Sequence, residues 1–90
     1  MEIVLSKNIL ITEVDEEGII LNTNSENFFG LNSTALLMWQ ALQEYETVEA
    51  AQEALLSQFE VDSDTLKQDL MALIYKLEER GLLEIVNAKT

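Results

Sequence analysis

Residues 27–39 read NFFGLNSTALLMW and join a short aromatic run directly to a helical pattern. In an extended strand the side chains alternate between two faces, which puts Phe29 and Leu31 on the same face. Phe28 and Gly30 then share the other face, where a glycine leaves room for an approaching backbone. The segment therefore predicts a strand edge beside a helix, an arrangement suited to recognition of another peptide chain.

The strand in this segment is expected to complete a small antiparallel sheet. Strand-like runs rich in Ile, Val and Phe occupy residues 9–14, 18–22 and 27–31, and polar breaks separate them. The first break ends in Gly18, which is expected at a turn position of positive φ. The second break, residues 23–26, consists of side chains that commonly hydrogen-bond a local turn. These signals predict a three-stranded meander.

Three amphipathic helices are expected after the sheet. Asn32 or Ser33 is suited to cap the first helix, and Thr47 the second. The third is expected to begin in the acidic cluster 62–65 and to end at Gly81. Their inner faces are expected to carry Ala35, Met38, Trp39, Leu42 and Tyr45 in the first, Val48, Ala51, Leu55 and Phe59 in the second, and Leu66, Leu70, Leu73 and Leu77 in the third.

The order of strands and helices defines the expected fold class. Three strands followed by three helices predict an α+β domain of winged helix-turn-helix type, with residues 1–90 forming one domain. Residues 82–86 either add a short strand or pack against the third helix, and the sequence leaves both options open. Residues 87–90 are polar and are expected to fray.

The composition argues against several classes of function. Five Lys and Arg stand against 17 Asp and Glu, a formal net charge of −12, which disfavours nucleic acid as a partner. The chain has no His and no Cys, which removes the commonest general base and the usual zinc ligands. Neither a signal peptide nor a membrane-spanning run is evident. We expect a soluble, cytoplasmic binding protein that is not an enzyme and uses no metal or cofactor.

Two apolar surpluses and one group of charges each allow two interpretations. The adjacent Phe28 and Phe29 fit either a strand covered on both sides or a binding surface. On the third helix an apolar surplus, formed by Met71, Ile74 and Tyr75, fits either a wide core-facing side or a peptide-binding wall. Three of the five cations, Lys67, Lys76 and Arg80, also lie there, and they either complement the helix dipole or meet carboxylates of a partner.

The aromatic segment also resembles a known family. The run FFGLNSTA at residues 28–35, followed by Met38 and Trp39, is similar to the aromatic-Phe-x-Leu-Asn-x-Thr-Gly/Ala pattern and downstream Trp of the PqqD-like family. The run GIIL at residues 18–21 and the run LEERGLL at residues 77–83 extend the resemblance over nearly the whole chain.

That family supplies the peptide-recognition elements of pathways for ribosomally made, post-translationally modified peptides. The resemblance implies that the leader of a precursor peptide is added as a strand along residues 27–31, in the cleft with the third helix. Carried over by position, the peptide-binding residues are Asn27, Phe28, Phe29, Gly30 and Leu31 on the strand and Lys67, Leu70, Met71, Ile74 and Tyr75 on the helix. On this basis Ile74→Glu is expected to weaken leader binding and to leave the fold intact.

The resemblance also implies partners. A chain of this length is similar to the leader-binding proteins of lasso-peptide pathways, which act beside a leader peptidase and a macrolactam cyclase. One alternative is a protein that presents the pyrroloquinoline quinone precursor to a radical SAM enzyme; a winged-helix DNA-binding regulator is a more distant one. The family's frequent Asp after the second strand is here Asn22 or Thr23, and its Gly before the aromatic is Glu26 or Asn27, so the subfamily stays open.

Overall fold

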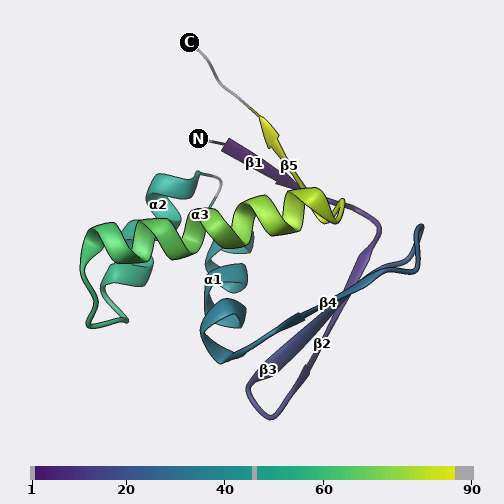
Figure 1. Cartoon of the computed structure of the whole chain (residues 1–90), viewed down its shortest axis with the longest axis horizontal. Helices are drawn as coiled ribbons and strands as arrows, with labels where there is room; N and C mark the ends of the chain where they lie inside the picture. Colours follow the sequence, from purple (N-terminus) through teal and green to yellow (C-terminus); the bar gives the residue numbers. More distant parts are fainter. Residues whose placement is uncertain (1, 46, 87–90) are drawn as a thin grey trace.

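The computed structural model describes residues 2–45 and 47–86 as five strands and three helices (Figure 1). The strands are β1 (Glu2–Leu5), β2 (Ile9–Val14), β3 (Glu17–Asn22), β4 (Phe28–Leu31) and β5 (Leu83–Val86). The helices are α1 (Ser33–Glu44), α2 (Val48–Leu56) and α3 (Ser63–Glu79). The expected order of a three-stranded meander followed by three helices is confirmed. Residues 87–90, expected to fray, lie outside the described residues.

The meander has the strand order β2-β3-β4, and all its pairs are antiparallel. The turn between β2 and β3 differs from the expectation, because Asp15 and Glu16, with φ of 53° and 68°, adopt the left-handed conformation. Gly18 lies instead inside β3, where an added Cβ would approach Leu36 Cδ1 to 3.0 Å. A side chain there would have to displace the end of Leu36, so glycine favours the close packing of β3 on α1, and the expected positive φ at Gly18 was wrong.

The helices begin at capping side chains that the sequence indicated. The Asn32 side chain accepts a hydrogen bond from the Ala35 N–H at 2.8 Å, which settles the choice between Asn32 and Ser33. Thr47 and Asp62 cap α2 and α3 in the same way. The inward faces of all three helices then meet the inner face of the meander in one hydrophobic core, in which Trp39, Ile20 and Leu70 are completely buried.

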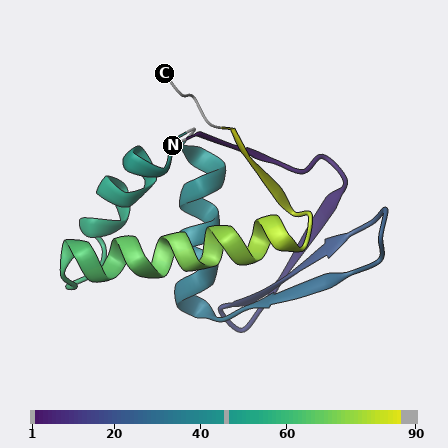
Figure 2. The ribbon, with the colours of Figure 1, turned by 45° about the horizontal axis from the view of Figure 1, so that its top comes forward.

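A second sheet joins the two ends of the described chain. β1 pairs antiparallel with β5, with Ile3 opposite Ile85 and Leu5 opposite Leu83. Residues 82–86 thus take the first of their two expected options, whereas β1 was not expected from the sequence. The β1–β5 pair lies on one side of α3 and the meander on the other (Figures 1 and 2). The C-terminal strand is therefore kept away from β4.

The end of α3 is tied to the meander by a glycine and a buried asparagine. Gly81 has a φ of 75°, and its neighbour Leu82 donates to the Leu77 carbonyl at 2.9 Å, the pattern of a Schellman C-cap. Asn22 Nδ2 donates to the Gly81 carbonyl at 3.4 Å. This contact fixes the C-terminal end of α3 beside the β3–β4 turn, and the expected end of the helix at Gly81 is confirmed.

The described part of the chain, residues 2–45 and 47–86, offers neither a membrane-spanning helix nor a metal-binding cluster. None of its helices combines the length and the apolar character needed to cross a lipid bilayer. No three side chains among its Asp and Glu residues gather closely enough to hold a metal ion.

Candidate functional site

β4 has an open edge. Among the described residues it pairs only with β3, because β5 is paired with β1. The Asn22 N–H donates to the Asn27 carbonyl at 2.8 Å, which sets the alternation of the antiparallel ladder. Every second residue of β4 then bonds to β3, and the N–H and C=O groups of Phe28 and Gly30 point to the open edge. These groups are free to pair with an added strand.

A groove runs along this edge between β4 and α3. It has a volume of about 320 Å³. The start of α1 contributes to its lining. The lining residues are Phe29 and Gly30 from β4, Asn32, Thr34, Ala35 and Met38 from the start of α1, and Asp69, Ala72, Leu73 and Lys76 from α3.

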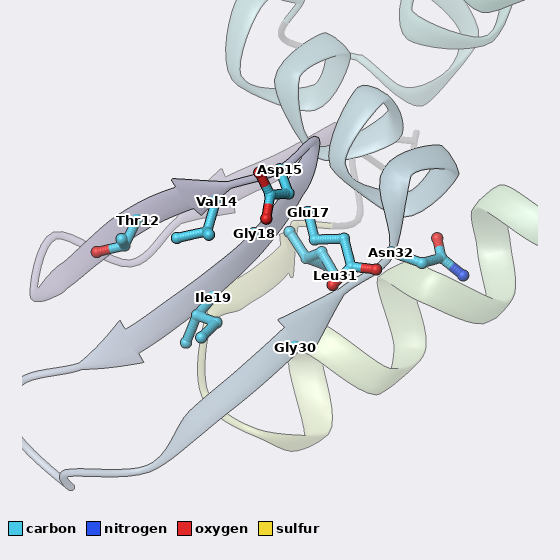
Figure 3. Close-up of a pocket in the computed structure, with 9 residues that line it drawn as sticks. All are labelled: Thr12, Val14, Asp15, Glu17, Gly18, Ile19, Gly30, Leu31 and Asn32. Atoms are coloured by element: carbon cyan, nitrogen blue, oxygen red, sulfur yellow. The ribbon is translucent and has the colours of Figure 1, made fainter.

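A second depression, of about 510 Å³, lies on the outer face of the meander (Figure 3). Val14 and Ile19, which line this depression, are 58% and 47% exposed. Gly30 and Asn32 border both this depression and the groove. A strand added to β4 would therefore place alternate side chains over two concave surfaces, one on each face of the extended sheet.

The two phenylalanines of β4 divide between the faces as the alternation predicts. Phe28 is 67% exposed on the outer face, whereas Phe29 is partly buried against the core. The Arg80 guanidinium lies over the Phe29 ring, 5.6 Å from its centroid. Phe29 therefore packs on the protein's own core, whereas Phe28 remains accessible, and the binding role of Phe28 stays a prediction.

The helix wall differs from the one carried over from the family resemblance. Leu70 and Ile74 are both 0% exposed and belong to the hydrophobic core, so neither presents a surface to a peptide. The burial of Ile74 argues against the expectation that Ile74→Glu leaves the fold intact, because the substitution would bury a carboxylate among apolar side chains. The apolar surplus at Ile74 reflects a wide core-facing side of α3.

The remaining three predicted helix residues lie on the opposite flank of α3 from the groove. At about 100° per residue, Met71 is roughly 140° around the helix from Lys76 and roughly 160° from Asp69. Lys67 and Tyr75 share the Met71 flank, and none of the three lines the groove. The groove wall is instead the mixed polar flank of Asp69, Ala72, Leu73 and Lys76. The apolar surplus on α3 did not indicate this flank. The sequence signal for it was the four-residue spacing of Lys76 and Arg80, which places the two cations side by side.

The open strand edge and the adjoining groove on a winged-helix-like α+β fold define a class of peptide-binding domain. Residues 17–83 match the family model described as "Coenzyme PQQ synthesis protein D (PqqD)". The chain belongs to the PqqD family.

Two solved structures resemble the whole chain. One is described as "Lasso peptide synthetase B1 complexed with the leader peptide"; it is 27% identical, with a TM-score of 0.81 over 94% of this chain and 100% of that chain. The other, "TbiB1 in Complex with the TbiA(beta) Leader Peptide", is 23% identical and has a TM-score of 0.81 over 97% of this chain and 98% of that one, which supports the fold. A comparison with curated proteins found no match.

Proposed function

We propose that this protein binds the leader segment of a ribosomally made precursor peptide by β-augmentation at β4. The leader forms an extended strand, pairs with the outward backbone groups of Phe28 and Gly30, and lies in the groove beside α3. Membership of the PqqD family supports this function, as does the likeness to a lasso peptide synthetase B1 protein that was solved with its leader peptide. The observation that carries the proposal is the open β4 edge with a depression on each side.

Backbone pairing and side-chain burial have different roles in this mechanism. The pairing depends little on the leader's sequence, whereas the two depressions select the side chains that enter them. An apolar leader residue buried against Leu73 or Phe29 contributes about 1.5–3 kcal/mol. A few such anchors give a dissociation constant in the micromolar to nanomolar range, about −8 to −12 kcal/mol.

The binding serves enzymes that act on the precursor. We propose that the protein presents the precursor to a leader peptidase and a macrolactam cyclase of a lasso-peptide pathway, in the cytoplasm where the precursor is made. Holding the leader raises the effective concentration of the precursor at the enzyme without chemistry by this chain. The absence of His and Cys from the sequence supports a role in binding and not in catalysis.

The family description supports one other candidate. A member of the PqqD family can present a quinone precursor to a radical SAM enzyme, and the family model carries the name of that pathway. The likeness to a lasso synthetase protein over 94% of this chain favours the lasso assignment. Calorimetry with both kinds of leader distinguishes the two, because the cognate leader should bind at least about tenfold more tightly.

Substitution of Gly30 tests the proposed edge. Gly30→Pro removes an N–H that points to solvent and not to β3, so the native ladder is kept and the fold should survive. We expect leader affinity to fall about tenfold or more, because a bond to the added strand is lost and the ring obstructs pairing. The matched control is Gly30→Ala, whose Cβ meets no atom within 4 Å and which retains the N–H. Equal affinity of the two variants in titration calorimetry would exclude β4 as the binding edge.

A further inference from the structure

The groove is electrically polarised along its length. The groove-facing flank of α3 carries Asp69 first, the apolar pair of Ala72 and Leu73 next, and then Lys76. Arg80 follows one turn later, over the Phe29 ring. Lys76 comes seven positions after Asp69, a distance of about 10 Å along the helix axis. One end of the groove is therefore acidic, its middle apolar and its other end basic.

The two cations at the basic end have no carboxylate partner in residues 2–45 and 47–86. No Asp or Glu oxygen there lies within 4.0 Å of the Lys76 ammonium or the Arg80 guanidinium. The chain has 17 acidic residues against five basic ones, so unpaired neighbouring cations are unexpected on composition alone. A carboxylate brought by a partner would complete this end of the groove.

The helix dipole explains only part of this placement. It favours cations in the last turn of α3, but it sets no preference for one side of the helix. Lys76 and Arg80 are four residues apart and so lie on the same flank, which is the flank that faces β4. Glu78, in the same turn, lies about 160° around the helix from Lys76, away from the groove, and Glu79, about 60° from Lys76, is not one of the residues that line it.

The orientation of α3 over β4 gives the charges a direction. Arg80 lies at Phe29, near the start of β4, whereas Asp69 lines the same groove as Asn32, which follows the end of β4. A strand that pairs antiparallel with β4 therefore begins at Asp69 and ends at Lys76 and Arg80. Antiparallel pairing also forms the slightly more stable ladder.

We infer that the groove selects leader peptides with an Asp or Glu that follows an apolar anchor residue. The inference rests on the proposed function and names the chemistry of its ligand. The anchor packs on Ala72 and Leu73, and the carboxylate reaches Lys76 and Arg80. At about 3.4 Å per residue and with alternating faces, the acidic residue lies two or four positions after the anchor.

Selection from a displayed library of random twelve-residue peptides tests this inference. The purified chain would be the target at low ionic strength, and only peptides that lose binding to Gly30→Pro would be scored. We expect enrichment of Asp or Glu two or four positions after a large apolar residue. In a selected peptide, Asp→Asn or Glu→Gln at that position should weaken binding about two- to fivefold, as measured by fluorescence anisotropy.

Two variants of α3 provide the matched comparison. Lys76→Glu should abolish the acidic enrichment or replace it with Lys or Arg. Lys67→Glu makes the same change of charge on the opposite flank of the same helix and should leave the enrichment unchanged. If the two variants change the acidic enrichment equally, the enrichment reflects only the net charge of the chain, and the inference is overturned.

The outcomes separate this inference from the proposed function. If no selected peptide loses binding to Gly30→Pro, the proposed edge is wrong and the charge preference is overturned with it. If edge-dependent peptides are found without acidic enrichment, or with the acid before the anchor, the proposed function stands and only the charge preference is overturned.

Discussion

Asn22 is a buried polar side chain that joins three parts of the molecule. It is 8% exposed, and its Oδ1 accepts from the N–H groups of Asn24 and Ser25 at 2.9 and 3.2 Å. Its Nδ2 donates to the Gly81 carbonyl. The side chain thus stabilises the β3–β4 turn and holds the end of α3 against it. The position of Arg80, at that end of α3, therefore depends on Asn22.

Asn22→Ala should therefore destabilise the protein. The change leaves two turn N–H groups and a carbonyl without their partner, a cost of about 1–3 kcal/mol in the free energy of unfolding. Urea denaturation followed by the fluorescence of Trp39, the one tryptophan of the chain, measures it. Asn24→Ala, at an exposed side chain, is the control and should change the stability by less than about 0.5 kcal/mol. A similar midpoint for both variants would contradict the assigned role of Asn22.

The same charge introduced at two neighbouring positions on α3 should have very different effects on stability. Ile74→Glu puts a carboxylate where the native side chain is 0% exposed, and we expect a loss of about 4 kcal/mol or more, enough to unfold a small domain. Tyr75→Glu changes a side chain that is 52% exposed and should stay within about 0.5 kcal/mol of the native protein. Circular dichroism and urea titration check both, and a folded, stable Ile74→Glu protein would refute the burial of this position.

At the scale of the elements, the function depends on which flank of α3 faces β4. The edge strand itself was predictable, because the alternation at residues 28–31 and the Asn32 cap are local signals. The facing flank was not evident from the apolar pattern, because the azimuth of a helix is set by its packing on the other helices. The apolar surplus of Met71, Ile74 and Tyr75 did not indicate the flank that lines the groove, and at Ile74 it marks the width of the core contact.

Filling the groove from α3 should block the leader. Ala72 is exposed and lines the groove, so Ala72→Phe places a ring where the leader is proposed to lie, with little effect on the core. We expect leader affinity, measured by calorimetry, to fall tenfold or more, about 1.4 kcal/mol. Lys67→Phe adds the same ring at an exposed position about 140° around the helix from Ala72, away from the groove, and should bind normally. Unchanged affinity in Ala72→Phe would exclude this groove.

At the scale of the whole molecule, long-range pairing determines what local patterns cannot. β1 has only four residues, and its partner β5 lies about 80 residues further along the chain. No local turn sequence therefore predicts this pairing. The meander and the three helices are built from short-range contacts, and their positions were predictable from turns, caps and periodicity. The β1–β5 pair is the part of the fold that the sequence did not reveal.

The β1–β5 pair should contribute to stability through one face. Ile3 is 8% exposed and belongs to the core, whereas its neighbour Val4 is 52% exposed. Ile3→Ser should lower the free energy of unfolding by about 2–4 kcal/mol, because it removes buried apolar surface. The same substitution at Val4 should cost less than about 0.5 kcal/mol. Equal denaturation midpoints in urea would show that β1 does not close the core.

An unpaired strand edge is also a template for the strand of an identical molecule, and repeated addition would produce fibrils. A net charge of −12 opposes such stacking, because every copy repels the next. That repulsion disappears near the isoelectric point of about 4.1, where the carboxylates take up protons. In neutral solution the acidic surface of this protein thus opposes self-association at the unpaired edge of β4.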